Sequence, residues 1–154
     1  MTQQIKTIAI IGVGVMGSGI AQIAAQSGHT TYLYDAKAGA AQQAKEKLAA
    51  TFQKLLDKNK ITVEQADAAN ANLLIAHELS DLKSCDLIVE AIIERLDIKQ
   101  SLMDQLEAIV PETTILASNT SSLSITAIAA NCQHPERVIG YHSVSYTHLR
   151  AHET

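Results

Sequence analysis

Three glycines at the end of an apolar run have the spacing of a turn that binds phosphate. Gly12, Gly14 and Gly17 follow residues 8–11 in the pattern G-x-G-x-x-G, which joins a strand to a helix in dinucleotide-binding proteins. Gly12 allows the tight turn, Gly14 lets a pyrophosphate approach the backbone, and Gly17 lets the helix pack close to the strand. The free N–H groups and the positive end of the helix dipole then face the anion. The sequence therefore predicts a pyrophosphate site at this turn.

An acidic residue follows this turn at the distance that ribose binding requires. Asp35 comes after an expected strand over residues 30–34 and lies roughly 20 residues beyond Gly12, where a carboxylate accepts hydrogen bonds from the adenine ribose. A carboxylate there repels a 2′-phosphate, which favours NAD over NADP, although Lys37 nearby keeps NADP as an alternative. The simpler alternative is that Asp35 only begins a turn.

Further polar residues follow the later strands. Glu90 and Glu94 come at the end of one expected strand, residues 118–122 follow the next, and His142 ends the last. In parallel sheets ligands bind outside the carboxyl ends of the strands, so these groups are expected at one edge. There are simpler alternatives: Ser122 or Ser124 caps the next helix, and His142 is an ordinary surface histidine.

The elements that position these residues alternate between strand and helix. Hydrophobic periodicity predicts strands over residues 6–11, 30–34, 73–76, 86–91, 114–117 and 137–141. It predicts helices over residues 18–27, 36–59, 62–71, 96–109 and 123–130, with a helical turn at 80–84. The alternation indicates an α/β fold with a doubly wound parallel sheet of the Rossmann type. The helices 36–59 and 62–71 are expected to form a helical hairpin inserted after the second strand, within residues 36–72.

Composition excludes several classes of protein. The chain has 154 residues, 47% of them hydrophobic, and a net charge of -4, which predicts a globular core and argues against general nucleic-acid binding. No apolar run reaches the ~20 residues of a membrane helix, and the N-terminus lacks the features of a signal peptide. Cys85 and Cys132 form no C-x-x-C pattern, so a reduced, cytoplasmic compartment is expected.

Residues 36–60 carry a local excess of positive charge in an acidic chain. Their lysines are Lys37, Lys45, Lys47, Lys54, Lys58 and Lys60, against Glu46 and Asp57. The charges fit either a solvated helix face or a patch that attracts a polyanionic substrate.

Four segments together resemble the NAD-dependent 3-hydroxyacyl-CoA dehydrogenases, in particular the bacterial 3-hydroxybutyryl-CoA and 3-hydroxyadipyl-CoA enzymes. They are residues 12–21, residues 90–94 with Lys99, residues 118–122 and residues 135–142. The resemblance implies an oxidoreductase of fatty acid metabolism that interconverts (3S)-3-hydroxyacyl-CoA and 3-oxoacyl-CoA with NAD. It also implies that the full-length protein is a homodimer, formed through a helical C-terminal domain.

The resemblance also assigns roles to individual residues. NAD is held by Gly12, Val13, Gly14, Val15, Met16, Gly17 and Asp35, and its nicotinamide half is contacted by Ala91, Glu94 and Lys99. Ser121 lies between the cofactor and the substrate oxygen, and Thr51 and Lys58 touch coenzyme A. His142 is the catalytic base, since an imidazole with a near-neutral pKa can take the hydroxyl proton.

The resemblance stops at His142. In the family the chain continues with Phe-Phe-Asn-Pro and then a helical domain, whereas residues 143–154 show neither. We therefore expect an NAD-binding domain over residues 1–142, a non-native or disordered tail, and no C-terminal helical domain. His148 and His152 have the spacing of metal ligands on a helix but lack a third ligand, so no metal is expected.

Two functional hypotheses follow. The chain is either the cofactor domain of a 3-hydroxyacyl-CoA dehydrogenase or, as it stands, a catalytically inactive NAD-binding module. An FAD-binding domain is a third, disfavoured alternative.

Overall fold

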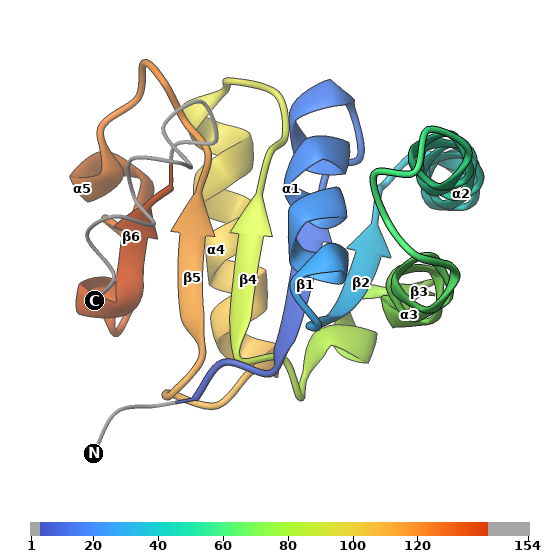
Figure 1. The fold of residues 1–154 in the computed structure, drawn as a ribbon. Coiled ribbons are helices and arrows are strands. Elements are labelled where there is room, and N and C mark those ends of the chain that lie inside the picture. The colour runs from blue at the N-terminus through green and yellow to red at the C-terminus, as the bar shows by residue number, and fades with distance from the viewer. Residues whose placement is uncertain (1–3, 142–154) are drawn as a thin grey trace.

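The computed structural model describes residues 4–141, which form a parallel sheet covered by helices on both faces (Figure 1). The strand order is β3-β2-β1-β4-β5-β6, and every neighbouring pair is parallel. The strands are β1 (Thr7–Ile11), β2 (Thr30–Tyr34), β3 (Leu73–Ile75), β4 (Leu87–Glu90), β5 (Ile115–Ser118) and β6 (Val138–Gly140). The predicted doubly wound Rossmann sheet is therefore confirmed.

Helices connect these strands. They are α1 (Val15–Gln26), α2 (Ala40–Asp57), α3 (Val63–Asn72), α4 (Leu96–Ile109) and α5 (Ile125–Ile128), with 3-10 turns η1 (Leu79–Leu82) and η2 (Pro135–Arg137). Figure 1 shows α1 in front of the sheet, α4 behind it, and α2 with α3 beside β2. The predicted hairpin of α2 and α3 after the second strand is confirmed. No helix in the described part of the chain is long and apolar enough to cross a membrane.

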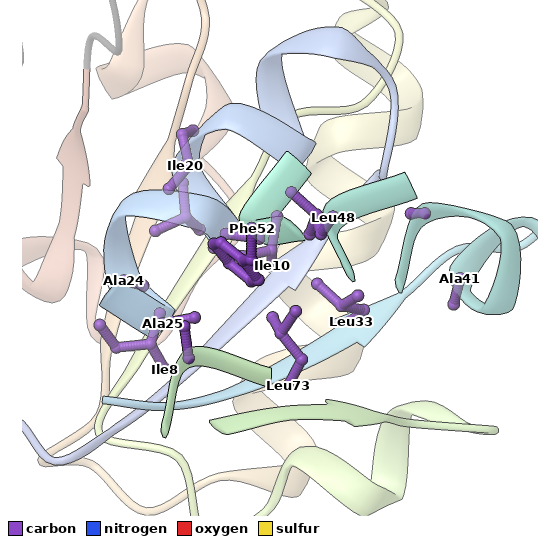
Figure 2. Close-up of a cluster of buried hydrophobic side chains, with 14 of the residues drawn as sticks. Ile8, Ile10, Ile20, Ala24, Ala25, Leu33, Ala41, Leu48, Phe52 and Leu73 are labelled. Carbon is purple, nitrogen blue, oxygen red and sulfur yellow. The ribbon is translucent and has the colours of Figure 1, made fainter. Parts of the chain in front are cut away.

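Strand β1 is the centre of the sheet because it is apolar on both faces. Ile8 and Ile10 face one cluster, together with Phe52 of α2, which is completely buried (Figure 2). Ala9 and Ile11 face a second cluster, built with α4 and β4. Since side chains alternate along a strand, a strand that packs on both faces must read as a continuous apolar run.

The order of strands reverses beside β1, and this reversal creates the crevice for a ligand. β1 pairs with β2 on one side and with β4 on the other. The connections after β1 and after β4 consequently leave toward opposite faces, and the carboxyl ends of these strands frame an opening.

Two predicted helix starts were wrong. α1 begins at Val15 rather than residue 18, because Gly14 adopts the extended backbone of a cap directly after the turn. α2 begins at Ala40 rather than residue 36, because Gly39 has a φ of 81° and interrupts any helix there. Residues 36–39 therefore belong to the loop after β2.

The helix predicted over residues 123–130 is shorter in the structure. The backbone N–H of Leu123 donates to Thr120 Oγ1 at 3.0 Å, which keeps Leu123 in the preceding turn. Ser124 then caps α5 by accepting from the N–H of Ala127. Ser124, and not Ser122, is the helix cap.

Other predicted boundaries agree closely with the structure. α4 spans the predicted residues 96–109. α3 follows its expected cap, Thr62, which forms a reciprocal capping box with Gln65. β2 matches its predicted bounds, and the other strands differ from prediction by no more than one residue at either end.

Candidate cofactor site

Two positions of the glycine turn after β1 can be occupied only by glycine. Gly12 has a φ of 94°, and a Cβ there would lie 2.6 Å from the carbonyl oxygen of Ala91. A Cβ on Gly17 would lie 1.7 Å from the carbonyl oxygen of Gly12. The turn is therefore packed against the end of β4 on one side and, as predicted for Gly17, against α1 on the other.

The N-terminus of α1 is open toward solvent. No atom outside the immediate chain lies within 4 Å of a Cβ built on Gly14, and Gly14 caps the helix without a side-chain hydrogen bond. The first N–H groups of a helix have no partners within the helix and attract anions. Val15 and Met16 occupy the first turn, and the side chain of Val15 is 90% exposed.

Asp35 lies beside this turn, at the end of β2. Its Oδ2 accepts a hydrogen bond from the backbone N–H of Val13 at 3.0 Å, and its Oδ1 accepts from the N–H of Lys37 at 2.9 Å. The register that pairs Ile11 with Tyr34 brings the turn and the acid to the same sheet edge. Asp35 thus does stabilise a turn, and it also stands next to the candidate pyrophosphate site.

A cleft of about 710 Å³ joins the glycine turn to Asp35, a volume in the range of small-molecule sites. Gly12, Gly14 and Asp35 line one side of it, and Ala91 lies at the end of β4. The opposite wall comes from η1 and α4, through Leu79, Asp97, Ile98, Ser101, Leu102 and Gln105. An open N-terminus, a turn free of side chains and a carboxylate in one cleft fit a dinucleotide. The wall residues of α4 were missed in the sequence, where they read only as one flank of an amphipathic helix.

A buried ionic cluster lies where the end of β4 meets α4. Lys99 and Glu90 are both 0% exposed, and the ammonium lies 2.7 Å from Oε1 and 2.8 Å from Oε2 of Glu90. Ser118 donates to Glu90 Oε2 and the N–H of Ile92 donates to Oε1. Lys99 was expected to contact the cofactor directly. That contact stays a prediction; in the structure the side chain is fully buried and its charge is paired inside the protein.

Glu94 connects this cluster to the surface. Its Oε1 lies 3.1 Å from Lys99 Nζ, while its Oε2 accepts from the hydroxyls of Thr120 at 2.8 Å and Ser122 at 2.7 Å. Burial raises the pKa of Glu94, but the hydrogen bonds from Ser122, Thr120 and Lys99 outweigh it and lower the pKa to about 2. The carboxylate is therefore ionised throughout the neutral range.

The predicted catalytic pair is only partly described. Ser121 is exposed on the turn after β5, and its N–H donates to Glu94 Oε2 at 3.3 Å. His142 lies outside the described residues. The turn that carries Ser121 nevertheless meets the end of β4 through Glu94, so residues 90–94 and 118–122 come together as predicted.

A second groove, of about 590 Å³, lies between α1 and α2. Its lining includes Gly14 and Asp35, shared with the first cleft, and the polar groups Ser18, Gln22, Lys37, Gln43, Lys47 and Thr51. Thr51 therefore faces a groove that starts at the glycine turn. Lys58 does not line it; this residue is the exposed C-terminal cap of α2.

A further group of possible metal ligands lies near the C-terminal end of α4, beside the loop that precedes η2. Asp104, Glu107 and Cys132 have ligand atoms within 4.8 Å of one another. The carboxylate of Glu107 already accepts hydrogen bonds from the N–H groups of Gln133 and His134. Burial, followed by the charge of Glu107, raises the pKa of the Cys132 thiol to about 11. This group anchors a loop and keeps its thiol protonated.

Comparison with known proteins gives the family. Residues 7–150 match the family described as 3-hydroxyacyl-CoA dehydrogenase, NAD binding domain. The match includes His142 and extends eight residues beyond it, into the segment that showed no resemblance in the sequence.

Individual bacterial relatives indicate the same family. The chain is 41% identical over 142 residues to the 3-hydroxyadipyl-CoA dehydrogenase of Escherichia coli K12, covering 92% of this chain and 30% of that protein. It is 40% identical to a probable 3-hydroxybutyryl-CoA dehydrogenase of Bacillus subtilis, covering 90% and 48%. The chain thus spans about a third to a half of the length of these relatives.

Solved structures share the fold. A 3-hydroxybutyryl-CoA dehydrogenase from E. coli superimposes with a TM-score of 0.89 at 41% identity, over 91% of this chain and 30% of that one. The (S)-3-hydroxybutyryl-CoA dehydrogenase of Ralstonia eutropha gives 0.85 at 37% identity, over 90% and 49%. The glycine turn, Asp35 and the cleft between them are consistent with the NAD cofactor that the family description names. The chain belongs to the family of 3-hydroxyacyl-CoA dehydrogenase NAD-binding domains.

Proposed function

We propose that this chain is the NAD-binding part of an oxidoreductase that interconverts (3S)-3-hydroxyacyl-CoA and 3-oxoacyl-CoA. The observation that carries the proposal is the single cleft that joins the open Gly14 turn to Asp35 in a chain of this family. The named activities of the bacterial relatives support the acyl-CoA substrate class. The chain spans less than half of the length of these relatives, so whether it turns over substrate by itself is a separate question.

Residues 12–17 and Asp35 would hold the adenosine diphosphate half of NAD. Val13, Val15 and Met16 belong to this set, because the turn and the first residues of α1 surround the exposed Gly14. Ala91 and Glu94 lie at the end of β4, where the nicotinamide half would extend. The resemblance assigns Lys99 to the same half, and its ammonium lies 3.1 Å from Glu94 Oε1.

The chemical step would need one group to hold the substrate oxygen and one to move its proton. When bound, NAD supplies the hydride acceptor. Ser121 is exposed on the turn after β5 and would orient the substrate oxygen. His142, one residue after Tyr141, would take the hydroxyl proton and return it in the reverse direction. No metal takes part in this scheme.

Coenzyme A would approach along the groove between α1 and α2. The ammonium groups of Lys37 and Lys47 line this groove together with Thr51, and such cations attract the phosphates of a polyanion. Lys58 lies two helical turns beyond Thr51 on the same helix and would contact a more distant part of the same ligand.

A catalytically inactive NAD-binding module is the second candidate, favoured by the short span of the chain relative to its relatives. The two are separated by titrating NAD by calorimetry and assaying acetoacetyl-CoA-dependent NADH oxidation on the same sample. Binding without turnover supports the module, and turnover shows that the residues present suffice. Failure to bind NAD contradicts both.

We further propose residues 1–142 as the NAD-binding domain, with a separate tail from residue 143. We also propose a cytoplasmic location, and the resemblance implies that the full-length protein is a homodimer formed through a helical C-terminal domain. Expression of residues 1–142 alone tests the boundary: an unchanged melting temperature supports it, and a lower one moves it toward residue 150.

A further inference from the structure

Exposed apolar side chains gather at the carboxyl edge of the sheet. Of the six large hydrophobic side chains that are exposed within residues 4–141, three lie there: Val15 is 90% exposed, Ile93 is 63% exposed and Met16 is 41% exposed. Figure 1 places the start of α1 and the loop after β4 at the same end of the sheet. Apolar side chains scattered singly over a surface need no explanation, whereas a group of them beside a cleft indicates a surface that a ligand or partner covers.

Val15 and Ile93 come from two segments that touch. A Cβ built on Gly12 would lie 2.6 Å from the carbonyl oxygen of Ala91 and 3.1 Å from Cγ2 of Ile92, so the glycine turn packs directly against the loop after β4. Val15 begins α1 shortly after this turn, and Ile93 follows Ile92. The two exposed side chains therefore leave the protein from neighbouring segments of backbone.

These two side chains border different features of the site. Val15 lines the groove between α1 and α2, which is also lined by Lys47. Ile93 lines the cofactor cleft and directly precedes Glu94, whose carboxylate accepts hydrogen bonds from the turn that carries Ser121. Figure 1 shows the elements in the same order across the molecule: α2, α1, β4 and then β5. The apolar pair thus lies between the lysine groove and the turn of Ser121.

A coenzyme A thioester has the same order of chemical character along its length. One end is a polyanionic nucleotide, the other carries the thioester and its acyl group, and an uncharged arm joins the two. Cations attract the phosphates, whereas an uncharged arm gains free energy in proportion to the apolar surface that it covers. NAD carries its charge at its centre and would use the N–H groups of the glycine turn, which leaves the exposed side chain of Val15 for another ligand.

We propose that the side chains of Val15 and Ile93 are specificity determinants that contact the uncharged arm of an acyl-CoA substrate, where it passes from the lysine groove to the turn of Ser121. This inference rests on the proposed function for the class of substrate. The exposure of the two side chains, and their place between the groove and the turn, do not depend on it.

The test compares two ligands on the full chain saturated with NADH. S-butyl-coenzyme A, a stable thioether, carries the whole arm, whereas adenosine 3′,5′-bisphosphate carries only a nucleotide with two phosphates. In calorimetric titrations, Val15→Ser and Ile93→Ser are each expected to weaken the binding of S-butyl-coenzyme A about fivefold, the loss of roughly one covered methylene group. Each should change the affinity for adenosine 3′,5′-bisphosphate less than about twofold. Equal losses for both ligands would overturn the inference.

Two further variants separate the apolar contact from the charged one. Val63→Ser is the matched control, because Val63 is an exposed valine that begins a helix, as Val15 does, but lines neither the groove nor the cleft. It should leave both affinities unchanged. Lys47→Gln should weaken both ligands, because it removes a cation from the groove, and its effect should shrink as salt is raised. Unchanged binding of both ligands to Lys47→Gln would remove the start of the path and overturn the inference.

Other occupants of the apolar pair give different results. If Val15→Ser lowers the affinity for NADH as much as that for S-butyl-coenzyme A, this side chain serves the cofactor. If the variant changes only the sedimentation coefficient of the chain, the side chain contacts a second copy. Either result overturns the inference.

Failure of the proposed function looks different from failure of the inference. If the proposed function is wrong, the wild-type chain binds neither NADH nor S-butyl-coenzyme A. If the wild type binds both ligands, and Val15→Ser and Ile93→Ser bind S-butyl-coenzyme A as tightly as the wild type does, the inference alone fails.

Discussion

The carboxylate of Asp35 accepts a hydrogen bond from the backbone N–H of Val13 at 3.0 Å, and so ties the end of β2 to the glycine turn. Its other oxygen accepts from the N–H of Lys37. Each carboxylate oxygen has two lone pairs, so both retain capacity for a ribose hydroxyl. One residue therefore shapes the turn and presents negative charge to the cleft.

Asp35→Ala is expected to weaken NADH binding by about 10- to 100-fold, the usual loss for a charged hydrogen bond. NADPH binding should fall much less, because removing the carboxylate also removes its repulsion of the 2′-phosphate. Parallel fluorescence titrations measure both. Equal losses for the two cofactors would leave Asp35 only its contact with Val13 and would contradict a ribose role.

Gly14, Gly17 and Gly19 should respond differently to substitution by alanine. Gly17→Ala should lower the free energy of unfolding by about 3 kcal/mol or more, because its Cβ would overlap the carbonyl oxygen of Gly12. Gly14→Ala should change stability by less than about 1 kcal/mol and abolish NADH binding. Denaturant unfolding and NADH titration of each variant measure the two effects.

Gly19→Ala is the control for this series. Gly19 has open space around it within α1, so alanine should stabilise the helix by up to about 1 kcal/mol and leave NADH affinity unchanged. If Gly14→Ala binds NADH as tightly as Gly19→Ala does, the pyrophosphate does not approach Gly14.

Lowering the pH should protonate Glu94 and weaken its hydrogen bonds to the turn of residues 120–122. The pKa of Glu94 is lowered from 4.5 to about 2, so between these values the unfolded chain binds a proton that the folded chain does not. The contribution of Glu94 is complete above the unfolded pKa and is lost as pH falls toward the folded pKa. The stability gap between wild type and Glu94→Gln, measured by urea unfolding, should thus narrow from about pH 5 to about pH 2. A gap that is constant over this interval would show that the carboxylate is not held by these donors.

Neither cysteine should react while the chain is folded. Burial, with a smaller contribution from Asp86, raises the pKa of the Cys85 thiol to about 12. The pKa of the Cys132 thiol is raised to about 11, mainly by burial. Since the thiolate is the reactive form, disulfide-exchange reagents at about pH 8 should modify native protein slowly and urea-unfolded protein quickly at both positions. Rapid modification of either thiol in native protein would contradict its raised pKa.

The glycine turn was predictable from the sequence because its backbone conformation restricts which residue types can occupy it. A turn with a φ of 94° at Gly12 and a helix packed against its carbonyl oxygen restrict residue type so strongly that the pattern is visible in one sequence. The start of α2 was not predictable in this way. Residues 36–38 have helical composition, and only the left-handed conformation of Gly39 separates them from the helix.

The ionic cluster was missed although the sequence carried a signal for it. Lys99 falls on the apolar stripe of α4, in line with Leu102, Met103 and Leu106, all of which are buried. Glu90 ends a strand whose preceding residues, Leu87, Ile88 and Val89, are apolar. A cation on a buried helix face and an acid in a buried strand must pair or be excluded. Their contact, and that with Ser118, depends on the packing of β4, β5 and α4 together, which no local pattern specifies.

The central claim is that the glycine turn and Asp35 bind the adenosine diphosphate half of NAD. Its most direct test is the backbone amide NMR spectrum of ¹⁵N-labelled full chain titrated with ADP-ribose. We expect the amides of Gly12, Val13, Gly14 and Val15 and those after Asp35 to shift together, with one dissociation constant, while those of α5 stay in place. Saturable binding that leaves the Gly12–Gly14 amides unmoved would contradict it.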